Sequence, residues 1–480
     1  MTRSTEIETD YLVVGSGAMG LAFADTLVAE SDARITIVDR HGQPGGHWND
    51  AYSFVALHQP SAYYGVNSMP LGSGIKDTHG VNAGLYELAT GPEVCGYFSA
   101  VMRQKLLASG RVDYLPMTDY RGDGQLVSLL TGDETRVKVR RRTVDATYTA
   151  TAVPSTTAPA YAVADGVRLV TPNALPHLAR SDAPVPTGYV IIGAGKTAMD
   201  AGVWLLGAGV PADRIRWVMP RDSWLINRQT TQPGAEFFHD SIGAYARKLG
   251  AFATATDTEA LFEQLEASGN MLRIDPSVRP QMFHYATVSI AEIEALRGIA
   301  DVIRHGRVRA IEADGLRFDD AFVPVAAGSL YIDCTASGIT RRPSVPVFAP
   351  DRITLQVVQG PLVTFSAALI AWVEAHMDDE DRKNALCAPF PFPNGILDFP
   401  QAELANLRHQ VLRSSEPALR GWIRDSRLDG FGKVVDGVTP DETDKMAVLG
   451  RLREAMRPAM ANLQVLAAQA TGDAVTAAMA

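Results

Sequence analysis

Two glycine-rich turns, each directly after a short apolar run, constrain the fold of this chain more than any other feature. The apolar runs occupy residues 11–14 and 189–192. The turns that follow them read Gly15-Ser16-Gly17-Ala18-Met19-Gly20 and Gly193-Ala194-Gly195-Lys196-Thr197-Ala198. In such a turn the first glycine permits a sharp change from strand to helix, the second admits a pyrophosphate, and the third small residue lets the helix pack on the strand. We therefore expect two dinucleotide-binding units in one chain.

The residues after each turn complete two strand–helix–strand units. Apolar residues at helical spacing predict a helix over residues 18–30, followed by a strand over 34–39. The second unit repeats the order with a helix over 197–206 and a strand over 214–219. Free N–H groups at the start of each helix attract phosphate groups. The pattern predicts an α/β fold with two Rossmann-like domains, an arrangement typical of a flavoprotein that a nicotinamide cofactor reduces.

Composition narrows the classes of function. The 480 residues include 44 Lys and Arg against 54 Asp and Glu, and the net charge of −10 argues against nucleic-acid binding. The three cysteines are widely spaced and form no CxxC pair, which excludes a dithiol redox centre. Lone cysteines suit a reducing cytoplasm. The histidines share no spacing with carboxylates that would indicate a metal site, and no apolar run reaches membrane-spanning length.

The residue at the end of the second strand of each unit predicts the nucleotide. The spacing between Gly15 and Asp39 is close to the roughly 20 residues expected for an acid that hydrogen-bonds a ribose, which suits FAD or NAD. Alternatively, Asp39 is a solvated residue at the end of the strand. Arg40, the next residue, is a further candidate for cofactor binding. In the second unit Arg221 stands near the place of the acid, where an arginine accommodates a 2′-phosphate, and this favours NADPH over NADH. Alternatively, Arg221 pairs with the adjacent Asp222.

Other polar residues near the second turn have two interpretations each. Lys196 begins the predicted helix and either reaches the pyrophosphate as a point charge or is a solvated lysine. Thr197 beside it is a second candidate for cofactor binding. Arg228 and Gln229 lie in a polar loop after Arg221 and are candidates for contact with the nicotinamide side.

The stretch Gly45-Gly46-His47-Trp48 adds a more specific signal. A first dinucleotide turn, an acid at the strand end and then a Gly-Gly-x-Trp loop resemble the class B flavin monooxygenases, which include flavin-containing, Baeyer–Villiger and N-hydroxylating enzymes. The second turn falls where those proteins bind NADPH. Residues 170–178 lack the Gly-x-x-x-His signature usual in the Baeyer–Villiger and N-hydroxylating groups, so the subgroup stays open.

The resemblance implies roles for the long irregular stretch 41–80. Residues 45–48 would wrap the pyrophosphate and ribose of FAD. Segment 57–67 would approach the isoalloxazine ring, with His58 and Asn67 as candidate catalytic contacts and Gln59 as a cofactor contact. The alternative is a packed surface loop in which such residues only stabilise the loop. Ser337 belongs to a stretch similar to the D-x-T-G return strand of many FAD proteins and is a further candidate for cofactor binding.

The resemblance also implies an order of domains and an activity. We expect a FAD-binding domain at 1–165, an NAD(P)H-binding domain at 185–325, a FAD-domain return segment at 326–360, and a mostly helical region at 361–480 that covers the site or forms a homodimer face. The implied activity is a cytoplasmic, FAD-containing, NADPH-dependent monooxygenase acting on a small organic substrate and O2, with no membrane partner. Two alternatives remain: an NAD(P)H:acceptor flavin oxidoreductase without oxygen insertion, and a nucleotide-binding protein without turnover.

Overall fold

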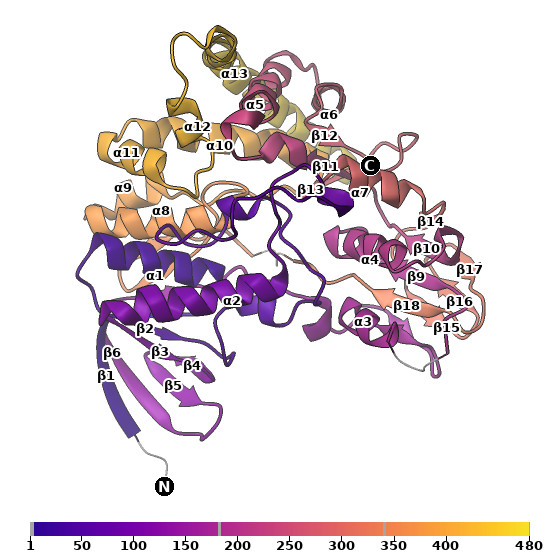
Figure 1. Cartoon of the computed structure of the whole chain (residues 1–480), viewed down its shortest axis with the longest axis horizontal. Helices are drawn as coiled ribbons and strands as arrows, with labels where there is room; N and C mark the ends of the chain where they lie inside the picture. Colours follow the sequence, from indigo (N-terminus) through magenta and orange to yellow (C-terminus); the bar gives the residue numbers. More distant parts are fainter. Residues whose placement is uncertain (1–3, 181–183, 339–341, 480) are drawn as a thin grey trace.

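The computed structural model describes residues 4–180, 184–338 and 342–479 of the chain. Two sheets with parallel central strands lie at opposite ends of the molecule, each with helices packed against it. The irregular segment after the first βαβ unit runs between them, and the C-terminal helices gather along one side (Figure 1). The α/β class with two Rossmann-like units is confirmed.

The first sheet is built around the first glycine turn. Strand β1 (Ser4–Val14) pairs in parallel with β2 (Ile35–Val38) and with β6 (Glu134–Asp145). The strand order is β19-β20-β6-β1-β2-β3, and the antiparallel pair β4–β5 extends from β6. The remaining strands are β3 (Val112–Leu115), β4 (Thr118–Gly122), β5 (Gln125–Ser128), β19 (Phe348–Ala349) and β20 (Arg352–Thr354).

Two helices that are far apart in sequence pack together on this sheet. Helix α1 (Ala18–Glu30) has the predicted bounds and lies beside α8 (Val363–His376). Both are apolar on nearly all sides, which is typical of helices buried in a core rather than laid on a surface. Leu21 and Phe23 of α1 and Leu369 of α8 are completely buried. Helix α8, the first helix of the C-terminal region, is therefore part of the core of the first domain.

The second sheet is entirely parallel and is built around the second turn. Strand β9 (Tyr189–Ile192) leads through the turn into α4 (Lys196–Gly207), and the strand order is β14-β10-β9-β18-β8. The four other strands are β8 (Leu169–Val170), β10 (Ile215–Val218), β14 (Asp301–Ile303) and β18 (Leu330–Asp333).

One predicted assignment is corrected by this pairing. The sequence predicts that residues 326–360 return to the first domain, but β18, the first strand of that segment, pairs with β9 and β8 in the second sheet. The chain reaches the first sheet again at β19 and β20, and β20 pairs in parallel with β6. A four-residue apolar strand carries no local signal for which of two parallel sheets it joins, so its sequence could not distinguish them.

A helical layer and two small sheets complete the molecule. Strands β11 (Ser223–Asn227), β12 (Met271–Leu272) and β13 (Met282–Val288) form one small sheet, and a second contains β7 (Ala162–Val163), β15 (Ala310–Glu312), β16 (Gly315–Arg317) and β17 (Phe322–Pro324). The other helices are α2 (Gly91–Val101), α3 (Leu175–Leu178), α5 (Phe238–Thr254), α6 (Thr258–Ala267), α7 (Ile290–Arg297), α9 (Glu380–Leu386), α10 (Phe399–Ser414), α11 (Pro417–Asp425), α12 (Gly432–Asp436) and α13 (Thr443–Met479).

The stretch 41–80 contains no α-helix and no named strand, as its lack of periodicity predicts. It is ordered by short 3₁₀ turns, Gly46–Asn49 and Ser61–Tyr63, with a third at Gly80–Asn82. Buried aromatic side chains anchor it, including Tyr52 and Tyr64. Contacts from Tyr52 and His58 join this segment to the second nucleotide unit and contacts from Ser68 join it to the first, whereas residues 72–76 and 78–80 are exposed.

Candidate functional site

The first glycine turn has the backbone geometry that the sequence predicts. Gly15 has a φ of +105°, a conformation that side-chain-bearing residues rarely adopt. A Cβ on Gly20 would lie 2.0 Å from the Gly15 carbonyl oxygen, so the helix can approach the strand only if that residue is glycine. A Cβ on Gly17 would meet only the backbone of Gly46, at 3.5 Å. Alanine and methionine at positions 18 and 19 are buried in α1.

The Gly-Gly-x-Trp loop folds directly onto this turn. The Gly45 N–H donates to the Ser16 carbonyl at 3.0 Å, and Gly45 and Gly46 have φ values of +133° and +57°. The Trp48 indole donates to the Tyr64 hydroxyl at 2.9 Å, which ties the loop to the segment at 57–67. Burial lowers the pKa of the neighbouring His47 to about 4, so its imidazole is neutral. The two predicted FAD-contacting stretches are therefore adjacent in space.

Asp39 is buried at the end of β2 and is not the solvated strand end of the alternative interpretation. Its carboxylate accepts from the Ser16 N–H at 2.5 Å and hydroxyl at 2.8 Å, and from the His41 N–H at 2.8 Å. Burial opposes its ionisation, but the hydrogen bonds from His41 and Ser16 outweigh burial and lower the pKa of Asp39. Arg40 points to solvent, with Nε 3.6 Å from Asp119.

The second turn repeats the arrangement around Gly193, whose φ is +132°. A Cβ there would lie 2.6 Å from the Cys334 carbonyl oxygen, and the Trp217 indole donates to the Gly193 carbonyl at 2.7 Å. A Cβ on Gly195 would meet nothing within 4 Å, so this backbone is open to a ligand. Ala198 is completely buried, as the third small residue of such a turn should be.

Lys196 is neither solvated nor directed at the open turn. Its side chain is 11% exposed and its ammonium group pairs with Asp200 and, at 3.2 Å, with Glu292 on α7. The solvated interpretation is wrong. Beside it, Thr197 is half-buried at the start of α4.

Arg228 completes this buried cluster of charges instead of contacting solvent. Its Nη1 lies 2.6 Å from Glu292, and its Nε donates to the His58 carbonyl at 2.8 Å. Burial opposes ionisation of Glu292, but the charges of Lys196 and Arg228 lower its pKa to about 2. Gln229 donates to Asp240 at 2.9 Å. The cluster therefore joins the second unit to the irregular segment.

His58 lies against this cluster, between the two nucleotide units. Burial, followed by the positive charges of Lys196 and Arg228, lowers the pKa of His58 to about 3, so its imidazole is neutral. Among the residues that the structure describes, neither ring nitrogen has a hydrogen-bond partner. The neighbouring Gln59 is half-buried. Asn67, the other catalytic candidate, lies in a different environment and accepts from the Ser426 hydroxyl at 2.8 Å.

Two further candidates lie at strand ends of the second sheet. Arg221 is exposed after β10. The alternative pairing with Asp222 is wrong, because Asp222 accepts from Arg304 at 2.9 and 3.1 Å and leaves Arg221 without an ion pair in the described part of the chain. Ser337 is exposed in the turn after β18, at the edge of the second unit rather than the first.

Three further residues of the site carry no motif: Tyr52, Asp200 and Glu292. The Tyr52 hydroxyl donates to Asp200 at 2.6 Å, and Asp200 in turn holds Lys196. An acid four residues after a lysine on a helix is a local signal for such a pair. Glu292 is 96 residues from Lys196 in sequence and has no comparable signal.

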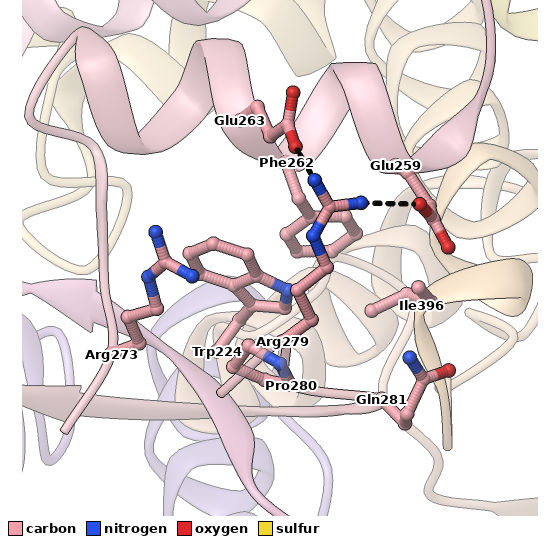
Figure 2. A pocket seen from close by; sticks show the side chains of 9 residues that line it. All are labelled: Trp224, Glu259, Phe262, Glu263, Arg273, Arg279, Pro280, Gln281 and Ile396. Carbon is pink, nitrogen blue, oxygen red and sulfur yellow. Dashed lines mark hydrogen bonds and ion pairs between the residues drawn. The ribbon is translucent and has the colours of Figure 1, made fainter. Parts of the chain in front are cut away.

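A small surface hollow lies away from both turns. Figure 2 shows Arg279 reaching toward Glu259 and Glu263 on α6, at 2.9 and 2.8 Å, with Arg273 over the Trp224 ring. The cavity is about 70 Å³. None of the predicted site residues lines it, so the glycine turns remain the candidate site. In the described ranges, no group of three His, Cys, Asp or Glu side chains is arranged to hold a metal. No described helix combines the length and apolar character needed to cross a membrane.

Comparisons with known proteins give one family match over part of the chain and several matches over most of it. The family described as NAD(P)-binding Rossmann-like domain matches residues 13–72. The uncharacterized proteins Rv2000 of Mycobacterium tuberculosis and Mb2023 of Mycobacterium bovis are each 50% identical over 423 residues, which is 88% of this chain and 78% of theirs. The open crystal structure of cyclohexanone monooxygenase matches with a TM-score of 0.51 and 14% identity, over 87% of this chain and 98% of that chain.

Proposed function

Because this chain belongs to one family with the mycobacterial proteins and has the fold of cyclohexanone monooxygenase, we propose that it is a FAD-containing, NADPH-dependent monooxygenase that uses O2 to oxygenate a small organic molecule. The observation that carries the proposal is the pair of open glycine turns in one chain. Backbone at Gly17 and at Gly195 is free of side chains that would block a pyrophosphate.

FAD fits the first unit. Residues 15–20 would hold the pyrophosphate, with Gly45 and Gly46 closing over it. Asp39 would meet the ribose; its carboxylate already accepts four protein hydrogen bonds, from Ser16 and His41, so a ribose hydroxyl must share or displace one of them. Bound FAD would supply hydride acceptance and activation of O2.

NADPH fits the second unit. The Gly195 turn and the start of α4 would receive its pyrophosphate, and Arg221 would receive the 2′-phosphate, because its guanidinium is exposed and unpaired within the described ranges. We propose that Lys196 supports cofactor binding indirectly, and not as a point charge on the pyrophosphate. Its ammonium group is held by Asp200 and Glu292, so it fixes α4 against α7 and sets the position of the turn.

The irregular segment supplies the residues between the two nucleotides. His58 is neutral and has free ring nitrogens in the described structure, so it can donate or accept a hydrogen bond without carrying charge. Buried aromatic side chains at Tyr52, Tyr63 and Tyr64 exclude water from the same segment. Water exclusion and positioning are the main demands that flavin oxygenation makes on a protein.

The test is a visible spectrum of the purified protein, recorded after anaerobic addition of NADPH and again after admission of air. The proposal expects a yellow protein with one FAD per chain, bleaching with NADPH, and substrate-dependent oxygen incorporation. Bleaching followed by stoichiometric peroxide release with every candidate substrate would instead identify the acceptor oxidoreductase. A protein that retains no flavin would identify the non-catalytic alternative.

A further inference from the structure

Residues 426–431, between α11 and α12, are bound along the segment 62–67, and we call them the strap. Arg427 makes the main contact. Its guanidinium donates to three backbone carbonyls of that segment, those of Val66 at 2.8 Å, Ala62 at 2.6 Å and Tyr64 at 2.6 Å. Because the five N–H donors of a guanidinium have a fixed planar geometry, hydrogen bonds to three carbonyls within five residues restrict the backbone conformation of the segment.

Two further contacts come from the ends of the strap. Ser426 donates to the Asn67 side chain at 2.8 Å. Gly430, with a φ of +83°, lies flat on the Tyr63 ring, and a Cβ there would be 2.9 Å from a ring carbon. The Phe431 and Tyr63 ring centroids are 6.1 Å apart. Ser426, Arg427, Gly430 and Phe431 thus contact the segment at residues 62–64, 66 and 67.

The opposite end of the segment is fixed to the first nucleotide unit. Asp25 on α1 accepts from the Ser68 N–H at 3.1 Å and from the Ser68 hydroxyl. Tyr97 on α2 donates to the Met69 carbonyl at 2.7 Å and receives a hydrogen bond from Arg427 at 3.3 Å. Residues 62–68 are thus held between the helix that begins at the first glycine turn and the C-terminal region.

Arg427 has no carboxylate ion pair among the residues that the structure describes, and its donors are directed at main-chain carbonyls and a phenol. A structural arginine at a surface usually pairs with an acid or extends into water. Here the guanidinium group instead fixes the backbone of a short irregular segment through hydrogen bonds. The Tyr63 hydroxyl beneath the strap is buried and has no hydrogen-bond partner in the described structure.

We propose that Arg427 is a positioning residue. Through the strap it sets the backbone of residues 62–67, which belong to the segment that the likeness to flavin monooxygenases places near the isoalloxazine ring, so the C-terminal region controls the geometry of the flavin site. This inference rests on the proposed function for the identity of the group that the segment faces. The contacts themselves are independent of that identity, and the experiment separates the two.

The experiment compares Arg427→Lys and Gly430→Ala with two matched controls. Lysine keeps the charge but loses the planar fork. Arg424→Ala removes an exposed arginine three residues away, and Gly421→Ala fills open space on α11. For each holoenzyme we would measure FAD content, amide hydrogen exchange over residues 62–67, and the rates of flavin reduction by NADPH and of reoxidation in air.

Both strap variants should keep FAD but exchange the amides of residues 62–67 about tenfold faster, as expected for loss of roughly 1.4 kcal/mol of local stability. The rate of flavin reduction or of reoxidation should change by about tenfold to a hundredfold, since a misplacement of about 1 Å at a reacting centre can change a rate by about a hundredfold. Both controls should match the unmodified protein. If Arg427→Lys does not fold, Ser426→Ala with Gly430→Ala replaces it.

Unchanged exchange in the strap variants overturns the inference whatever the cofactor is. Faster exchange with unchanged flavin rates also overturns it, because the segment would then be fixed without facing the flavin. If the unmodified protein binds no FAD, the proposed function fails. The positioning role toward flavin fails with it, and the exchange data then report only whether the strap holds the segment.

Discussion

The Tyr52 hydroxyl lies 2.6 Å from a carboxylate oxygen of Asp200, and this hydrogen bond joins the irregular segment of the first nucleotide unit to the first helix of the second. Asp200 also holds Lys196, which pairs with Glu292 and so with Arg228. Two acids and two bases thus form a buried cluster between the units.

Replacement of Gly17 by valine should abolish FAD binding. The Gly17 backbone is open on the side where a pyrophosphate would lie, and a branched side chain would occupy that space. Flavin absorbance per chain after purification is the measurement. Gly96→Val, at an exposed glycine with nothing within 4 Å of its Cβ position, is the control. Full flavin occupancy in Gly17→Val would show that the first turn is only structural.

Arg221→Ala should narrow the preference for NADPH over NADH, mainly by raising KM for NADPH. A hydrogen bond to a charged group contributes about 1.5–3 kcal/mol, which is roughly tenfold or more in affinity. Steady-state kinetics with both cofactors measure this preference. Arg279→Ala, an exposed arginine beside the surface hollow, should leave it unchanged. Equal kinetics with the two cofactors in the unmodified protein contradict the assignment.

Glu292→Gln should destabilise the fold by about 3 kcal/mol, since it leaves the buried charge of Arg228 without its partner. This loss of unfolding free energy is at the lower end of the range for removal of one partner of a buried ion pair, because Asp200 still pairs with Lys196. Urea unfolding followed by circular dichroism gives the value. The exposed pair of Arg309 and Asp319 provides the control, and Asp319→Asn should have little effect on the midpoint. Similar midpoints for both variants would argue against a tightly coupled cluster.

His41 should make stability depend on pH. Its ring lies 3.0 Å from Asp39 and 2.9 Å from Asp50, and the hydrogen bond to Asp39 is the main cause that raises its pKa from 6.5 to about 9. Its contribution is therefore complete below pH 6.5 and is lost as pH rises through 9. Because the ring is partly exposed, solvent screening reduces this contribution. Between pH 6.5 and pH 9 the free energy of unfolding of the unmodified protein should therefore fall by about 1 kcal/mol more than that of His41→Gln. The control is the exposed His79→Gln, whose stability should depend on pH as that of the unmodified protein does. A stability–pH profile of His41→Gln that runs parallel to that of the unmodified protein would refute the prediction.

His58→Ala should leave FAD content and Tm nearly unchanged while altering the rate of flavin reduction. The imidazole is neutral and has free nitrogens in the described structure, so its removal leaves no partner unsatisfied. Stopped-flow absorbance with NADPH measures the rate. An identical rate in the variant would return residues 57–60 to a structural role.

Local patterns predicted the parts of the fold that depend on local geometry. Apolar spacing gave the bounds of α1 without error, and the glycine turns have the expected conformations, because strand, turn and helix are adjacent in sequence. The likeness to flavin monooxygenases is confirmed at the level of fold. The surroundings of Lys196 could not be predicted, since Glu292 reaches it only through packing of α7 on α4. The sheet that β18 joins could not be predicted either, because it depends on pairing with strands that are distant in sequence.

The order of strands in the first sheet has a consequence for synthesis on the ribosome. All strands of the second sheet are contained in residues 169–333, whereas the first sheet needs β20 at Arg352–Thr354 and its core needs α8 at Val363–His376. Domains generally fold as units while the chain emerges. We therefore expect the nascent chain to complete its second nucleotide unit before the first, because α8, the packing partner of α1, begins more than three hundred residues after α1 ends.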